Sequence, residues 1–190
     1  MTESHNSTLR LELRCLQLIK RQSFMLLLCE RAMPQLVAFS AETDFNHDLY
    51  SECVDIAWLD VMQQTHRSNY KDLATECLAR SPDTEEFDHP MASAALNACL
   101  ITATAMRFFD GHETECIIDG AALAIDAAAM SAQRSNAHHP RSLSSAELKR
   151  DPLVRRELAQ QISDLQYVAD LPTEPIEAFV ASVKARARGD

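Results

Sequence analysis

Ser23-Phe24-Met25-Leu26-Leu27-Leu28-Cys29-Glu30-Arg31-Ala32-Met33-Pro34 is the stretch that decides the fold of this 190-residue chain. Apolar side chains lie on every side of the short helix that it predicts, and a helix that is apolar all round is buried in a core. The charged pair Glu30-Arg31 follows where this core helix ends. Neighbouring residues on a helix project about 100° apart, so we expect these two side chains to have different partners. Pro34 predicts that a new short helix begins there and runs to residue 42.

The composition favours an all-α fold. Only three residues are glycine, and the alternation of Val, Ile and Thr that is typical of strands is scarce. Hydrophobic residues make up 46% of the chain, which is enough for a sizeable core. Prolines and capping residues divide the chain into about seven to nine helices. The two longest, residues 90–109 and 113–133, are rich in alanine, so we expect a closely packed, central antiparallel pair.

One helical domain over residues 1–190 is expected. Residues 1–7 are polar and are expected to be disordered, and residues 135–144 form a seam between segments. After this seam, Ser144 and Glu147 have the spacing of a helix capping box, and Asp151 precedes a proline suited to the first helical position.

Charge and cysteine usage restrict the classes of function. The formal net charge of −10 opposes the counterion exchange that holds proteins on nucleic acid, so nucleic-acid binding is disfavoured. No uninterrupted apolar run approaches the ~18 residues of a membrane span. The six cysteines include no C-x-x-C pair and are predicted to be core thiols in a reducing compartment. We therefore expect a cytoplasmic protein that does not enter a membrane.

Leu9-x-Leu11-Glu12, followed by Cys29-Glu30-Arg31-x-x-Pro34 and later by Tyr50, resembles the pattern of the YjaG-like family of bacterial proteins, which is domain of unknown function 416. The similarity covers most of the chain in order, and the Cys-Glu-Arg-x-x-Pro segment is its most specific part. The resemblance implies an all-α cytoplasmic bacterial protein and supplies no catalytic residues. The chain departs from the family pattern at Ala94 and Asn97, where a proline and an aspartate are expected. The residues that carry the resemblance are Leu9, Leu11, Glu12, Phe24, Met25, Leu28, Cys29, Glu30, Arg31, Pro34, Phe39, Thr43, Phe45, Tyr50, Asp55, Trp58, Phe87, Asp88, Ala98, Cys99, Glu147, Leu148, Lys149, Pro152, Val154, Glu157 and Gln161.

A polar site or structural lock is predicted around Glu30, Arg31, Asp55, Trp58 and Asp88. In the structural interpretation, Arg31 braces helix-terminal carbonyls or a carboxylate such as Asp55, while Glu30 meets a different donor. In the functional interpretation, a buried carboxylate acts as an acid or base through a raised pKa. The structural interpretation is favoured, because ion pairs that lock helices commonly perturb pKa values without doing chemistry.

Metal and nucleophile motifs are incomplete. Glu86 and His89 form one E-x-x-H motif, whereas a di-iron bundle needs two such motifs and further glutamates. His112 and Cys116 have i, i+4 spacing, but a structural zinc site needs four ligands. Burial of Cys29 would raise the pKa of its thiol and oppose nucleophilic catalysis. We therefore expect no catalytic residues, no metal site and no cofactor, and we favour a protein that is not an enzyme.

Two kinds of function remain. The first is a non-catalytic module that binds a protein partner or itself, which is favoured by the alanine-rich helices and by the apolar stripe of the last helix. The second is a small-ligand- or metal-binding protein or an enzyme that uses carboxylates at a helix junction. Its candidate residues are Glu30, Asp55, Asp88 and Asp126.

Overall fold

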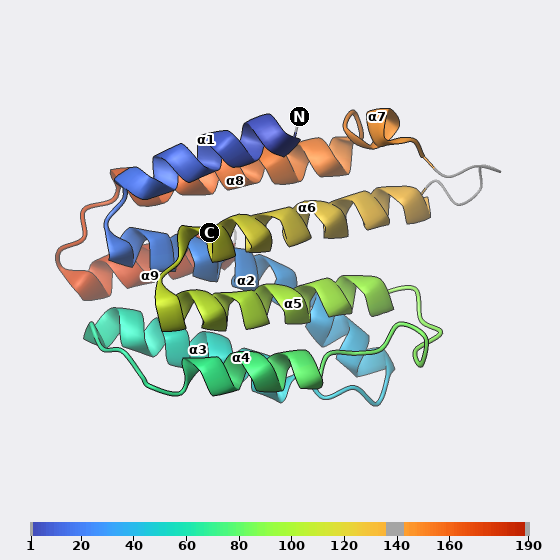
Figure 1. The fold of residues 1–190 in the computed structure, drawn as a ribbon, viewed down its shortest axis with the longest axis horizontal. Helices are drawn as coiled ribbons and strands as arrows, with labels where there is room; N and C mark the ends of the chain where they lie inside the picture. Colours follow the sequence, from blue (N-terminus) through green and yellow to red (C-terminus); the bar gives the residue numbers. More distant parts are fainter. Residues whose placement is uncertain (1, 136–142, 189–190) are drawn as a thin grey trace.

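Helices make up the regular secondary structure of residues 2–135 and 143–188, which are the residues that the computed structural model describes. No strand occurs in these two ranges, so the all-α prediction is confirmed (Figure 1). The helices within them are α1 (Thr2–Cys15), α2 (Leu18–Glu42), α3 (Asp48–Gln63), α4 (Tyr70–Ala79), α5 (Ala92–Gly111), α6 (Thr114–Ser135), α7 (Ser145–Leu148), α8 (Pro152–Asp170) and α9 (Ile176–Arg188).

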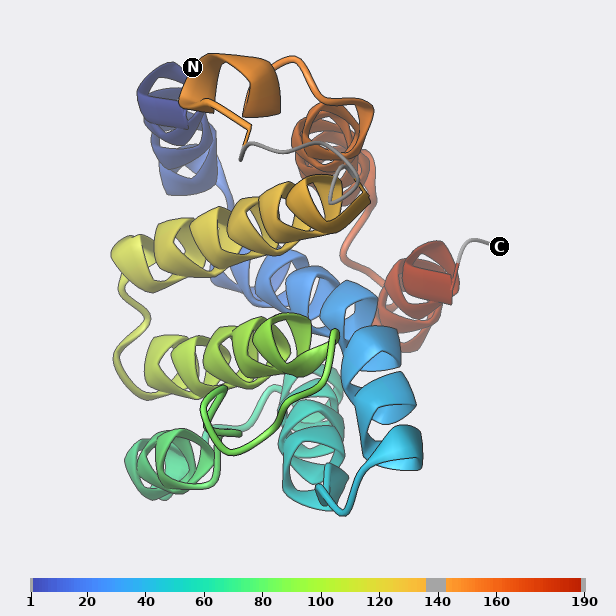
Figure 2. The ribbon, with the colours of Figure 1, turned by 90° about the vertical axis from the view of Figure 1, so that its right-hand side faces the viewer.

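Helix α2 is the central element of the bundle, as its apolar sequence predicts. The side chains of residues 24–29 are at most 1% exposed. The helix packs against α3, α5, α6, α8 and α9, and Figure 2 shows it passing through the middle of the molecule. It has neighbours on every side, which is why no polar face is needed along this stretch.

Pro34 does not begin a new helix, so the predicted break is wrong. Helix α2 continues through Pro34 to Glu42. Proline removes one backbone donor and crowds the preceding turn, which bends a helix rather than ending it when packing holds both halves. Leu36 and Phe39, beyond the proline, are fully buried like the residues before it. The change of direction along α2 is visible in Figure 2.

Helices α5 and α6 form the expected alanine-rich pair and lie side by side (Figures 1 and 2). Glycine has a specific role on α6, at its approach to α2. A Cβ atom on Gly120 would lie 2.7 Å from Cε of Met25, closer than ordinary van der Waals contact. The absence of a side chain at this position therefore lets α6 approach α2 closely.

Two helices, α2 and α5, are long and apolar enough to cross a membrane by length and hydropathy alone. Within the bundle, 78% of the relevant window of α5 and 44% of that of α2 are buried. A helix at the centre of a bundle meets the same criterion, so this finding is weak support for a membrane span.

Helix α1 begins earlier than the sequence suggests. Disorder was expected over residues 1–7, whereas α1 begins at Thr2. Two contacts explain the difference, since Leu9 and Leu13 are fully buried and the His5 ring lies 2.9 Å from Oε1 of Gln161 on α8. The predicted seam at residues 135–144 lies largely outside the described residues. Immediately after it, the predicted capping box of Ser144 and Glu147 is confirmed.

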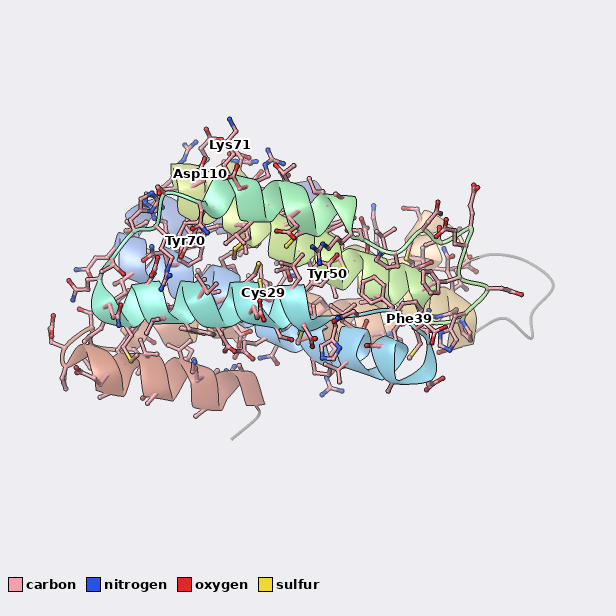
Figure 3. All side chains as sticks on the ribbon, turned by 90° about the horizontal axis from the view of Figure 1, so that it is seen from below. Cys29, Phe39, Tyr50, Tyr70, Lys71 and Asp110 are labelled. Atoms are coloured by element: carbon pink, nitrogen blue, oxygen red, sulfur yellow. The ribbon has the colours of Figure 1, made fainter. Side chains whose placement is uncertain are left out.

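Helices α3 and α4 close the lower side of the bundle in Figure 1. Tyr50 and Tyr70 lie in the layer between these two helices (Figure 3). The hydroxyl of Tyr50 donates to the carbonyl of Cys77 at 2.9 Å, and the sulfur atoms of Cys53 and Cys77 lie 3.7 Å apart. All four side chains are fully buried. The layer therefore buries its few polar atoms with partners, as close packing requires.

Candidate functional site

Glu30 meets the indole of Trp58, one of the other residues predicted for the polar site. Nε1 of Trp58 donates to Oε1 of Glu30 at 2.8 Å, and the Trp58 side chain is 1% exposed. The ammonium of Lys184 lies 5.3 Å from the centre of the same indole ring. This arrangement ties α2, α3 and α9 together, and it satisfies the buried indole donor.

Arg31 points to a different set of partners, as predicted, but Asp55 is not among them. One guanidinium nitrogen donates to Asp164 and the other donates to Oε1 of Glu157 at 3.0 Å. Asp164 is 1% exposed and also accepts from Nε of Arg186 at 3.0 Å. Asp55 is exposed on α3, so the suggested pairing with Arg31 is wrong.

The Arg31 network is a lock between helices. It joins α2 to α8 through Glu157 and Asp164, and it reaches α9 through Arg186. The sequence held one signal for it: Glu157 and Asp164 are seven residues apart, so they lie on one face of α8. Only the approach of α2 to that face shows that both carboxylates serve the same guanidinium.

Cys29 does not have the properties of a nucleophile. Its side chain is fully buried, and burial raises the pKa of its thiol far above the ordinary range, with the carboxylate of Glu30 adding to the effect. The thiolate needed for nucleophilic attack is therefore scarce near neutral pH.

The carboxylates proposed for a helix-junction site do not gather. Asp55, Asp88 and Asp126 are exposed and belong to α3, to the segment between α4 and α5, and to α6. Nε2 of His89, from the suggested E-x-x-H motif, lies 3.1 Å from Oε2 of Glu42 on α2. Among the described residues, no group of three or more His, Cys, Asp or Glu side chains is placed to hold a metal ion.

A cavity of about 530 Å³ opens at a different junction of helices. Four segments meet there: the start of α2, the end of α3 with the loop after it, the turn between α5 and α6, and the loop between α8 and α9. Its walls are formed by Gln17, Leu18, Ile19, Gln22, Asp60, Val61, Gln64, Thr65, His66, His112, Thr173 and Glu174.

Asp60 supports one wall of this cavity. Its side chain is 2% exposed and accepts hydrogen bonds from Thr65 at 3.0 Å, Arg67 at 2.9 Å and Tyr70 at 2.8 Å. Burial alone would raise the pKa of Asp60, but the hydrogen bonds from Tyr70, Arg67 and Thr65 outweigh it and hold the pKa below the usual range. Asp60 thereby fixes the loop that carries His66.

The Asp60→Asn variant is expected to be less stable than the wild type by about 2 kcal/mol at pH 7, because hydrogen bonds to a charged acceptor are the stronger ones. A lowered folded-state pKa contributes stability above the unfolded value of about 3.9, and this contribution is lost as the pH falls through the folded value. The difference between the two proteins should therefore shrink below about pH 4. Urea unfolding from pH 3 to pH 7 measures it, with the exposed Asp55→Asn as control; a gap that is constant with pH would contradict the assignment.

Two histidines contact each other in the wall of the cavity. The ring centres of His66 and His112 are 5.4 Å apart, and the ring of His112 also packs edge-on against Phe108. His112 has a φ of 57° and takes the left-handed position at the end of α5. Burial lowers the pKa of His112, and His66 lowers it further. A neutral imidazole offers one hydrogen-bond donor and one acceptor.

Sequence reasoning did not identify this cavity. Asp60, His66, His112 and Glu174 come from segments that are far apart in the chain, and no spacing rule links them. One residue of the sequence could have pointed to the cavity. Asp60 is a carboxylate near the end of an apolar helix, next to the buried Val61. A charge so placed must find partners when it is buried.

Known proteins place the chain in a family. The model for proteins of unknown function DUF416 matches residues 8–190. Proteins called uncharacterized protein YjaG are similar over 171 residues, with 24% identity in Salmonella typhimurium strain LT2 and 23% in Escherichia coli K12; these matches cover 89% of this chain and 86% of each relative. A crystal structure of a DUF416 family protein from Shewanella baltica has the same fold, with a TM-score of 0.79 at 19% identity over 95% of this chain and 93% of that one. The predicted resemblance is thus confirmed, and the chain belongs to the DUF416 family of proteins of unknown function.

Proposed function

We propose that this protein binds a small polar molecule in the cavity between α2, α3, the α5–α6 turn and the α8–α9 loop, without converting it chemically. The observation that carries the proposal is the cavity itself. Its volume of about 530 Å³ lies within the range of ~300–1,000 Å³ that is usual for small-molecule sites.

The lining of the cavity supports a polar ligand. Leu18, Ile19 and Val61 contribute apolar lining, while Gln22 and Thr173 add groups that can both donate and accept hydrogen bonds. Binding pockets commonly combine apolar walls with a few polar groups that orient the ligand. The lowered pKa of His112 adds a second property that is enriched at functional sites.

Binding without catalysis is favoured because the buried acid of the cavity is already engaged. Both oxygens of Asp60 accept hydrogen bonds from Thr65, Arg67 and Tyr70. A carboxylate held in this way, with a lowered pKa, is a weak base for proton abstraction.

Two sequence features favoured an interaction module, namely the alanine-rich helices and the apolar stripe of the last helix. Both pack within the bundle. The alanine-rich helices α5 and α6 pack on one another, and α9 packs against α2 and α3. In α9, Phe179, Val180 and Val183 are at most 5% exposed. These sequence features therefore account for folding and leave the cavity as the stronger basis for a function.

A cytoplasmic location in a bacterium, away from membranes and nucleic acid, is part of the same proposal. It is supported by five buried cysteines that act as small apolar residues, by the net charge of −10 and by the bacterial relatives. Cell fractionation of a bacterium that makes this protein, followed by detection with an antibody, tests the location. Recovery in the membrane fraction would contradict it.

Ligand-observed NMR with a library of water-soluble fragments tests the proposed binding site. Fragments that bind the wild type are expected to bind Gln22→Trp at least about tenfold more weakly, because the indole would fill the cavity beside Ile19. Gln133→Trp is the matched control, since Gln133 is exposed on α6 and does not line this cavity. Equal binding to wild type and Gln22→Trp, or no fragment binding to the wild type, would refute the proposal.

A further inference from the structure

Four basic residues belong to the junction of α7 and α8. Lys149, Arg150, Arg155 and Arg156 are all exposed, and their side chains make no ion pair with any other described residue. Other arginines on the surface do find partners, as Arg10 does at 2.7 Å from Glu115. We call these four residues the basic patch. Three carboxylates lie in the same segment, but Glu147 and Asp151 take part in the caps of α7 and α8, and Glu157 pairs with Arg31.

Four acidic residues belong to the segment between α4 and α5. Asp83, Glu85, Glu86 and Asp88 are exposed, and within the described part of the chain they too form no ion pair. Asp83 accepts a hydrogen bond from the backbone of Glu85 at 2.8 Å, which shapes the segment locally. We call these four residues the acidic patch.

The two patches lie at the same end of the bundle. In Figure 2, which views that end, α7 and the start of α8 are at the top, the segment between α4 and α5 is below, and α6 lies between them. Two exposed apolar side chains belong to these elements, Met130 of α6 and Leu153 of α8, each 40% exposed. Leu153 and Arg156 also line part of a hollow of about 240 Å³ between α2, α6 and α8.

We propose that this end of the bundle binds a second copy of the same chain, with a two-fold axis between the basic patch and the acidic patch. A two-fold interface brings the same surface of both subunits together, so each patch meets its opposite on the partner twice. Met130 and Leu153 would lie between these contacts and lose their exposure to water. Both patches belong to the same chain. A second copy therefore supplies the opposite charge for each patch, and no other protein is needed.

The net negative charge does not prevent this association at ordinary salt. Charges on opposite surfaces of the two subunits are separated by far more than the screening length, which is about 8 Å at physiological ionic strength. The contacts between patches are short and are screened much less. Local charge complementarity therefore sets the orientation of the dimer.

Sedimentation velocity at two salt concentrations tests the association. The wild type is expected to be a dimer at about 0.1 M sodium chloride and to shift toward monomer at about 1 M, where the screening length falls to about 3 Å. A wild-type protein that is monomeric at both salt concentrations would overturn the proposal. So would a dimer that is unaffected by salt.

Charge reversal tests the patches themselves. Arg155→Glu with Arg156→Glu, and Glu85→Lys with Glu86→Lys, are each expected to weaken dimerisation at least about tenfold, because like charges then face each other twice. An equimolar mixture of the two variants restores both attractive contacts and should form a heterodimer. Asp110→Lys with Glu113→Lys, at the exposed α5–α6 turn of the opposite end, is the control and should dimerise normally.

Mixing the two variants distinguishes the loss of a specific interface from a general effect of charge or of misfolding. Two variants that have lost their fold would not recover a dimer when mixed, whereas two complementary surfaces would. Circular dichroism of each variant checks the helix content. Failure of two folded variants to associate, or dimerisation of either variant alone, would overturn the proposed surface.

Discussion

Leu27→Ala is expected to lower the free energy of unfolding by about 2–5 kcal/mol, the range for a fully buried leucine. Leu27 is 0% exposed at the centre of α2, where the helix has neighbours on every side. The substitution removes apolar contacts and leaves a cavity that surrounding helices cannot easily fill. Urea unfolding followed by the fluorescence of Trp58, the single tryptophan of the chain, measures the loss.

Leu78→Ala provides the matched control for this prediction. Leu78 is 49% exposed on α4, so its truncation removes little buried surface and should change the midpoint of unfolding only slightly. If Leu27→Ala were no more destabilised than Leu78→Ala, the central position of α2 would be wrong.

Arg31→Met is expected to lower the free energy of unfolding by about 3 kcal/mol, the low end of the range for breaking a buried ion pair. The Asp164 carboxylate, 1% exposed, would lose one of its two arginines and keep Arg186. Glu157 would lose the same guanidinium and keep its 2.8 Å hydrogen bond from Gln161. The remaining partners explain why the loss is not larger. Urea unfolding measures it.

Two further variants show whether the buried geometry of Arg31 matters. Arg31→Lys keeps the positive charge but cannot present two parallel donors to Asp164 and Glu157, so an intermediate loss is expected. Arg10→Met breaks the exposed pair with Glu115 and should leave the unfolding midpoint unchanged, because solvent screens such pairs. Equal destabilisation by Arg10→Met and Arg31→Met would show that burial is not what gives Arg31 its importance.

The Arg31 network also explains the charged end of the apolar stretch. An apolar stretch that is followed by Glu-Arg within a core helix could hold a reactive acid, a metal or a lock. The indole of Trp58 engages Glu30, and two carboxylates of α8 engage Arg31. The segment that most specifically marks the family is therefore explained by the packing of α2 against α3 and α8.

The cavity has a different origin from that lock. It forms where the ends of several helices meet, and helix ends leave backbone groups and polar side chains at the junction. His112 shows the effect: it takes the left-handed position that ends α5, and this position brings its ring against His66 from another loop. In the sequence, His112 belongs only to the incomplete i, i+4 pair with Cys116, and no spacing links it to His66.

The sequence by itself determined the properties that depend on neighbours along the chain. The scarcity of glycine and the helical spacing of apolar residues predicted the all-α fold, and Ser144 and Asp151 predicted the starts of α7 and α8. The burial of the apolar stretch of α2 was also predicted from the sequence, because a helix without a polar face is stable only in a core.

Tertiary structure alone decided the properties that depend on distant segments. Packing on both sides of Pro34 kept α2 continuous, although the local effect of proline favours a break. The partners of Arg31 and the walls of the cavity are set by how helices cross, and crossing depends on the fit of side chains across the whole core. Helix periodicity specifies which face is buried, but it does not specify which helix covers that face.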